Sequence, residues 1–383
     1  MGTEIQLKTN HEVLVWARES IALSRNEAAK RLNMTNGRLE QLESGNRTPV
    51  LTELKQLSKV YKRTIATLLL QNPPKEKSLP KDRRTVNSEQ LNVFHEKTIL
   101  AVRKARALAR SLEELKEESG IVTRRFDIKA TLNDSPEKLA IELNKQWNIE
   151  GLQQLGNANV VLEAFIELIE SLGIAVFQQP LTQDGLRGFS LMDEKIPVIV
   201  IKRGSEATTA KIFTLFHELG HVILHDVGIC DINFDPNAQK IEKWCNSFAG
   251  EVLVPANQLF EMEIVQQYIY SNEKSWARKD VFELVNHFHV GPLAILRRLL
   301  ENDLITKGFY RENHEKWNRP SFGRSKHPEG RNVPKEKLKE RGRMFVNLAF
   351  DLYDQNKMNL KDLSDYLEVK LSKIPQTRQL LNT

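Results

Sequence analysis

Hydrophobic residues recur every three or four positions through the first part of the chain, which is the period of an α-helix. Ser24, with Glu27 three residues later, forms a capping box that begins one helix. Thr35 is the expected N-cap of the next helix, which ends at Gly45. The apolar positions of these helices and of the following one are Ala28, Ala29, Leu32, Leu39, Leu42, Leu51, Leu54, Leu57 and Val60. The pattern predicts an all-α domain over residues 1–70.

The middle of the chain changes from a helical to a strand-like period. Apolar residues spaced three or four apart predict a long helix over about residues 90–118, and helical patterns continue to about Gly173. Short runs rich in branched and aromatic residues follow. They predict three strands, at residues 174–177, 188–192 and 198–202.

Helical periodicity then returns for the rest of the chain. Helices are predicted at residues 207–225, 240–253, 281–288, 293–302, 344–355 and 360–367. The predicted fold class is therefore mainly α with a small β-sheet (α+β). The predicted segments are an all-α domain (1–70), a proline-rich charged linker (71–88), a domain that contains the sheet (89–270), a helix-turn-helix-like unit (271–305), a basic linker (306–343) and a small helical C-terminal module (344–383).

The composition is that of an ordinary globular protein of two or three domains. The chain has 383 residues, of which 40% are hydrophobic and 28% charged. Its apolar runs are too short to cross a bilayer, and its first residues lack the pattern of a secretion signal. Two cysteines in a chain of this length are typical of a reducing compartment. We therefore expect a cytoplasmic protein that has no membrane partner.

The formal net charge is +6, and basic residues are concentrated near the C-terminal part of the chain. Residues 307–343 contain twelve Lys or Arg and five Glu. A solvated linker is the simpler interpretation of this run. The alternative is an arm that contacts phosphate groups.

The candidate metal-binding and catalytic residues lie in the sequence Phe213-Thr-Leu-Phe-His217-Glu218-Leu-Gly-His221. Two histidines four residues apart stand on one face of a helix, so both imidazoles can reach one ion. Glu218, next to the first histidine, is placed to take a proton from water that zinc has activated. The surrounding residues are apolar, and a buried cluster of these polar groups would be costly without a metal or partners. The motif therefore predicts a zinc site with Glu218 as the catalytic residue.

A catalytic zinc ion needs a third protein ligand. Glu242 is the favoured candidate, because it lies 21 residues after His221 at the beginning of another predicted helix. The alternatives are Glu251, Asp231, Asp235 and His225, of which His225 is better interpreted as a residue beside the site. Cys230 and Cys245 are conceivable zinc thiolates. For Cys245 a small core residue is the better interpretation, since aromatic and small residues surround it.

Residues from about 79 to 305 resemble the ImmA/IrrE family of metallopeptidases. The matching stretches are LPKDRRT (79–85), RGFS (187–190), PVIV (197–200), the histidine motif and CNSFAGEVLVP (245–255). The resemblance implies a zincin-like fold in which His217, His221 and Glu242 bind Zn²⁺ and Glu218 is the acid/base. It also implies regulated proteolysis of repressors or antitoxin-like proteins in stress response, mobile-element control or toxin–antitoxin systems. A helix-turn-helix unit after the peptidase core, here about residues 277–304, is similar to the family as well.

Residues 10–70 resemble the Xre family of phage-repressor-like helix-turn-helix domains, mainly through Ser24 to Gly45. In such a domain the second helix of the motif enters the major groove of double-stranded DNA. The resemblance places five residues at or near DNA: Arg25, Thr35, Asn36, Arg38 and Gln41. Asn and Gln can pair with adenine, and Arg with guanine. Xre domains commonly act as dimers on two half-sites, so a homodimer is expected.

Gly37 departs from this pattern. Glycine offers no side chain to a base and weakens a helix by about 1 kcal/mol. The alternative is that this domain serves in protein interaction or dimerisation.

Two functions from different classes follow. The first is a DNA-binding regulator whose zinc endopeptidase domain cleaves a protein regulator of the repressor or antitoxin type. The second is a non-proteolytic Xre-type antitoxin or repressor that uses the metallopeptidase fold to bind a partner. A weaker third hypothesis is that residues 344–383 neutralise a toxin, for which a capping or dimerisation module is the simpler interpretation.

Overall fold

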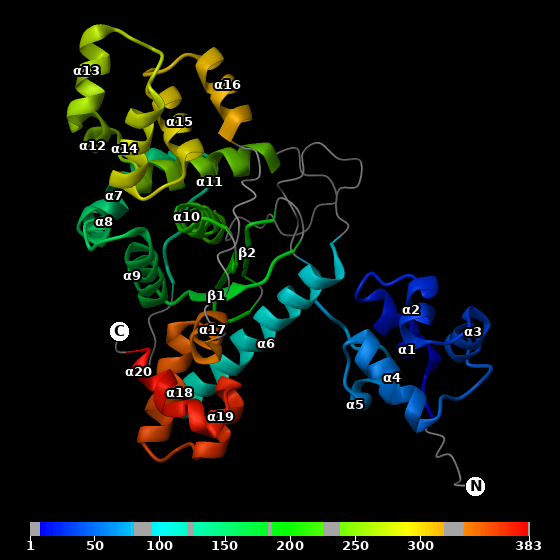
Figure 1. The fold of residues 1–383 in the computed structure, drawn as a ribbon. Coiled ribbons are helices and arrows are strands. Elements are labelled where there is room, and N and C mark those ends of the chain that lie inside the picture. The colour runs from blue at the N-terminus through cyan, green and yellow to red at the C-terminus, as the bar shows by residue number, and fades with distance from the viewer. Residues whose placement is uncertain are drawn as a thin grey trace. The chain divides into compact units, whose positions relative to one another are not determined.

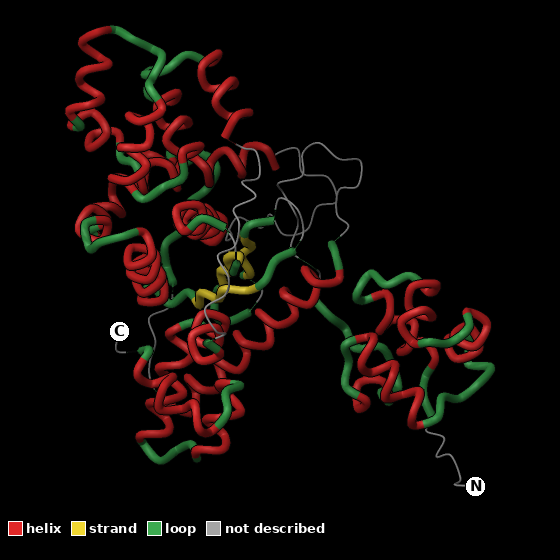
Figure 2. The backbone as a smooth tube through the Cα atoms, viewed as in Figure 1, coloured by secondary structure: helices red, strands yellow, loops and turns green. Residues whose placement is uncertain are grey.

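The computed structural model describes residues 8–77, 79, 94–120, 126–182, 186–192, 194–204, 206–224, 238–317 and 332–381. The chain divides into two compact units (Figures 1 and 2). The first unit comprises Met1–Arg103 with Thr182–Asp184, and the second comprises Lys104–Leu181 with Gly185–Thr383. The fold is mainly α with one three-stranded sheet, as predicted.

Five short helices form residues 8–77 of the N-terminal unit. They are α1 (His11–Glu19), α2 (Arg25–Leu32), α3 (Asn36–Glu43), α4 (Leu51–Tyr61) and α5 (Ile65–Leu68). The side chain of Ser24 accepts a hydrogen bond from the Glu27 backbone N–H at 3.3 Å, and Thr35 caps α3 in the same way. Gly45 follows α3 with a φ of +78°, in the left-handed region that favours glycine. The predicted helix boundaries in this unit are therefore confirmed.

A buried carboxylate ties these helices together. Glu43 at the end of α3 is 4% exposed and accepts a hydrogen bond from Arg18 Nε at 2.7 Å. Arg25 Nε and the Tyr61 hydroxyl donate to the same carboxylate, at 3.1 and 3.2 Å. Because a buried charge is costly without partners, these three donors keep Glu43 stable inside the unit.

The long helix α6 (Glu96–Ser119) agrees with the predicted helix, whose first residues lie outside the described ones. The three strands are β1 (Ala175–Gln179), β2 (Gly188–Leu191) and β3 (Val198–Lys202), arranged in the order β1-β3-β2. β1 is parallel to β3, and β2 is antiparallel to it with Gly188 opposite Ile201. Nearly every strand residue is buried, so elements cover both faces of the sheet.

Helices α9 (Ala158–Ser171) and α10 (Thr208–Leu224) pack on one face of the sheet (Figure 1). Val176, Ile199 and Ile201 of the strands share a core with side chains of both helices. Strand residues alternate between faces, so Phe177 points to the opposite side, where it lies close to Gly342. The second unit also contains α7 (Pro136–Trp147), α8 (Ile149–Gln153), α11 (Ala238–Leu253), α12 (Ala256–Glu261), α13 (Glu263–Ser271), α14 (Arg278–Phe288), α15 (Pro292–Glu301) and α16 (Lys307–Trp317).

The predicted helix-turn-helix-like unit, residues 271–305, is part of the main core. Buried residues of α14 and α15 belong to the same hydrophobic cluster as those of α10 and α11. α15 packs between α11 and α16, and Ile295, Leu296 and Leu299 are fully buried. Helix α15 therefore has a packing role in the second unit.

The basic linker predicted at residues 306–343 is contradicted, because two helices occupy most of its described part. α16 packs Phe309, Tyr310 and Trp317 against the core, and α17 (Val333–Arg341) buries Leu338. Several charges in the described part of the run are paired within the chain. Lys337 and Arg341 contact Glu368 at 2.5 and 2.8 Å, and Lys339 contacts Glu163 at 3.6 Å. The sequence predicted a linker here because ion pairs with distant acidic residues cannot be inferred from the local charge pattern.

The C-terminal helices cover the face of the sheet opposite α10. α17 and α18 (Arg343–Asp354) pack against β1, followed by α19 (Leu360–Leu367) and α20 (Ile374–Gln379). Glu170 of α9 accepts a hydrogen bond from the Met344 backbone N–H at 2.9 Å. The C-terminal helices are thus joined to the sheet-containing core.

The N-terminal unit also carries an excess of basic residues. Residues 8–77 contain thirteen Lys or Arg and seven Glu, an excess equal to the net charge of the whole chain. A basic domain of this kind is suited to nucleic acid. Among the described helices, none has the length and apolar character needed to cross a membrane.

Candidate metal centre and DNA-contacting helix

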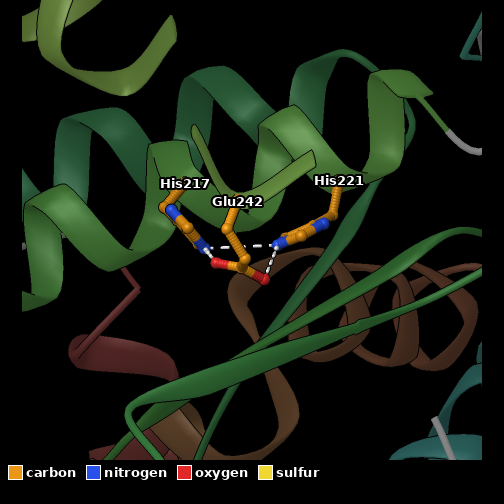
Figure 3. A group of neighbouring side chains, drawn as sticks. All are labelled: His217, His221 and Glu242. Atoms are coloured by element: carbon orange, nitrogen blue, oxygen red, sulfur yellow. Dashed lines mark hydrogen bonds and ion pairs between the residues drawn. The ribbon is translucent and has the colours of Figure 1, made fainter. Parts of the chain in front are cut away.

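His217 and His221 project from the same face of α10 (Figure 3). They are separated by one helical turn, and their Nε2 atoms are 3.2 Å apart. The two rings are nearly perpendicular, with an interplanar angle of 74°. The pair of nitrogens therefore converges on one point.

Glu242 of α11 completes a group of three donors (Figure 3). Its Oε2 lies 3.2 Å from His217 Nε2, and its Oε1 lies 3.3 Å from His221 Nε2. Gly220 lets α10 and α11 approach closely, because a Cβ at this position would lie 3.2 Å from Cys245 Cα. Among the described residues this is the one cluster of three His, Cys, Asp or Glu side chains with metal-ligand spacing.

The three donors fit a zinc ion. Tetrahedral coordination with bonds of about 2.0–2.1 Å places ligand atoms about 3.3 Å from one another. The observed separations are 3.2, 3.2 and 3.3 Å. Two imidazole nitrogens and one carboxylate oxygen are also a donor set found in catalytic zinc sites, where water takes the fourth position.

The charges of these donors are coupled. Burial disfavours the charged form of His221, but Cys245, Glu242 and Glu218 outweigh it and raise the pKa of the imidazole. Burial likewise disfavours the Glu242 carboxylate, but hydrogen bonds from His217 and His221 lower its pKa below the usual range. The imidazoles and the Glu242 carboxylate thus stabilise each other's charged forms.

Glu218 lies beside this group, 2% exposed, where α10 meets β2. A Cβ on Gly188 would lie 3.3 Å from Glu218 Cγ and 2.7 Å from the Val200 carbonyl oxygen. Glycine at the start of β2 is thus required for the strand to pass next to Glu218. The position of Glu218 is consistent with the predicted acid/base.

Two residues of α11 contact the histidines. Asn246 Oδ1 is 3.1 Å from His217 Nδ1, and a hydrogen bond joins the Cys245 and His221 side chains. Asn246 was not predicted to lie at the site, and Cys245 was interpreted as a core residue rather than a zinc thiolate. The available signal was spacing, because residues three and four positions after Glu242 share its helical face.

Glu251, the main rival of Glu242, is used elsewhere. Its carboxylate is paired with Arg298 of α15 and accepts a hydrogen bond from the Ala256 backbone N–H at 3.1 Å. It does not belong to the group of three donors. Four further candidate ligands lie outside the described residues: His225, Cys230, Asp231 and Asp235.

The helix predicted to contact DNA is α3. Asn36 and Gln41 are exposed on it, and Thr35 caps its N-terminus. The guanidinium of Arg38 is held by Glu53, with Nε at 2.9 Å from Oε1, and Arg25 is paired with Glu43. The structure thus leaves the two amides on the surface and engages both arginines in ion pairs.

Paired histidines on a helix that face a carboxylate from a second helix, beside a small mixed sheet, define a metallopeptidase-type domain. Residues 169–300 match the family model of the IrrE N-terminal-like domain, a peptidase family, and residues 14–68 match the helix-turn-helix family model. No curated protein matches the chain. The chain therefore combines a helix-turn-helix DNA-binding domain with an IrrE-like domain, as its sequence resemblances predicted, and all three donors lie within the IrrE-like match.

Proposed function

We propose that this protein is a DNA-binding transcriptional regulator whose zinc-dependent endopeptidase domain cleaves a protein regulator of the repressor or antitoxin type. Such a protein would act in stress response, mobile-element control or a toxin–antitoxin system. The observation that carries the proposal is the convergence of His217, His221 and Glu242 at zinc-ligand distances next to Glu218.

His217, His221 and Glu242 are the proposed ligands. Zinc held there supplies Lewis acidity, which lowers the pKa of a water molecule and polarises the scissile carbonyl. Glu218 takes the proton from the attacking water and returns it to the leaving amine. Glu218 is buried on the side of α10 that faces β2, and this burial holds the carboxylate in place for both proton transfers.

The N-terminal unit is proposed to bring the peptidase to an operator in double-stranded DNA. Asn36 and Gln41 offer exposed amides to adenine, and Thr35 fixes the beginning of the helix that carries them. Arg25, whose side chain is 45% exposed, is proposed to reach a phosphate group, and Arg38 to act at the same surface. A homodimer would place two such helices on two half-sites.

The test compares wild-type protein with Glu218→Gln in the cell. Both proteins are expected to contain zinc by mass spectrometry, but only the wild type should generate new protein N-termini in a proteome-wide survey. Glu261→Gln, an exposed substitution on α12, is the matched control and should behave as wild type. If Glu218→Gln binds zinc and retains the full biological effect, proteolysis is not the mechanism and the peptidase fold acts by binding a partner.

A further inference from the structure

The histidines of the metal centre have a second set of neighbours that the proposed reaction does not use. Their Nε2 atoms face one another and Glu242, so each ring presents Nδ1 on its other side. α11 supplies a polar group to each ring: the Asn246 amide at Nδ1 of His217, and the Cys245 thiol as a hydrogen-bond partner of His221.

The contact between Asn246 and His217 has a defined direction. The amide oxygen Oδ1 has no hydrogen to give, so His217 Nδ1 donates to it across 3.1 Å. A neutral imidazole with its proton on Nδ1 has its lone pair on Nε2. That lone pair points toward Glu242, where the ion would be bound.

The contact between Cys245 and His221 is largely buried, since the His221 side chain is 12% exposed. Cys245 is 0% exposed, and α10 approaches it through Gly220, whose Cβ position would lie 3.2 Å from Sγ. The Cys245 thiol is a hydrogen-bond partner of the His221 ring, although sulfur forms weaker hydrogen bonds than oxygen. Residues of one helix, α11, therefore contact both histidines.

The spacing on α11 explains how one helix does this. Glu242, Cys245 and Asn246 are three and four residues apart, so they lie on one helical face toward α10. Any rotation of α11 would displace the carboxylate ligand and both orienting groups together.

The geometry points to Asn246 and Cys245 as positioning residues that hold the Nε2 atoms of His217 and His221 toward the metal. This inference rests on the proposed zinc site. Groups that orient metal-binding histidines fix the ring tautomer and raise the basicity of the ligand, and their loss typically weakens metal affinity about 10–100-fold.

The test uses the full chain with Asn246→Ala, Asn246→Asp, Cys245→Ala and Cys245→Ser. Ser247→Ala is the matched control, because Ser247 is the next residue on α11 and is partly buried like Asn246. Zinc affinity is measured by competition with a chromophoric chelator. The site of the ring proton is read by nuclear magnetic resonance on zinc-loaded protein with ¹⁵N-labelled histidine.

We expect Asn246→Ala and Cys245→Ala to bind zinc about 10–100-fold more weakly than wild type. Asn246→Asp and Cys245→Ser restore an acceptor and should recover most of the affinity. In Asn246→Ala, the Nδ1 proton of His217 should lose its hydrogen-bonded signal, which a purely structural role would leave unchanged. Ser247→Ala should match wild type in both measurements.

The outcomes separate the two proposals. If wild type and Ser247→Ala bind zinc, and Asn246→Ala and Cys245→Ala bind it equally tightly with unchanged histidine signals, this inference is overturned and the zinc site stands. If neither wild type nor Ser247→Ala binds zinc, both the proposed function and this inference are overturned.

Discussion

Arg298 of α15 is paired with Glu251 of α11 inside the main core. The two side chains are 5% and 4% exposed, and Arg298 Nε also donates to the Val254 carbonyl oxygen at 3.0 Å. Gly250 makes room for the guanidinium, since a Cβ there would lie 3.0 Å from Arg298 Cδ. The pair fixes the end of the helix whose beginning carries Glu242.

This pairing predicts that substituting the two carboxylates of α11, Glu242 and Glu251, affects zinc binding and stability differently. Glu242→Gln should lose zinc, because it removes one of the three proposed ligands. Glu251→Gln should keep zinc but destabilise the fold by about 3–5 kcal/mol, because it leaves the Arg298 charge buried without its partner. Zinc content and urea unfolding of both variants decide this. Loss of zinc in a folded Glu251→Gln protein would contradict the assignment of Glu242.

Zinc binding should depend on pH. The pKa of His221 is raised, so its imidazole carries a proton near neutral pH, and that proton must leave before Nε2 can bind metal. Zinc affinity should therefore increase as the pH rises through the neutral range, with release of a proton. Calorimetry in two buffers of different ionisation enthalpy measures this release. An identical heat in both buffers would contradict the prediction.

The stability of the second unit should also depend on pH through Glu170. Burial raises the pKa of this carboxyl from 4.5 to about 8, although backbone N–H groups of Met344 and Val176 act against it. Because the folded state holds the proton more tightly, its stability is greatest below the unfolded pKa and decreases as pH rises toward 8, by at most about 1.4 kcal/mol per pH unit. Glu170→Gln should remove this dependence. Urea unfolding of both proteins between pH 4.5 and 8 measures this dependence. If the free energy of unfolding changes with pH in Glu170→Gln as it does in wild type, the prediction is refuted.

Gly342, which joins α17 to α18, should tolerate no side chain. Its φ is +80°, and a Cβ would lie 2.6 Å from the Val176 carbonyl oxygen. Gly342→Ala is expected to destabilise the protein by about 1–3 kcal/mol. Gly308→Ala on α16 is the control, because the nearest atom to its Cβ position is 3.8 Å away. Thermal unfolding of both variants should show a large decrease only for Gly342→Ala.

Gly37 should accept a side chain in the N-terminal unit. No atom lies within 4 Å of its Cβ position, so Gly37→Ala is expected to stabilise α3 by up to about 1 kcal/mol. Gly45→Ala should be destabilising, since its φ is +78° and its Cβ would lie 3.0 Å from His11 Nδ1. Hydrogen exchange of amides in α3 distinguishes the two. Weaker protection in Gly37→Ala would contradict the prediction.

Local patterns were sufficient for much of this protein. The caps at Ser24 and Thr35, the turn at Gly45 and the strand Val198–Lys202 agree with the structure, because each depends on residues that are neighbours in sequence. The paired histidines could also be predicted, since four residues on a helix bring them to one face. The class of protein followed from these motifs and is confirmed by the two family matches.

Only the tertiary structure decided which distant groups meet. The sequence alone left Glu242 and Glu251 as competing candidates, because both lie on one helix. The approach of α10 and of Arg298 to different parts of that helix distinguishes them. Likewise, only the structure shows that basic residues of the segment 307–343 are paired with distant acidic residues such as Glu163 and Glu368. Hydrophobic periodicity and capping act over a few residues and are written in the sequence, whereas ion pairs and buried hydrogen bonds join residues that only the folded core brings together.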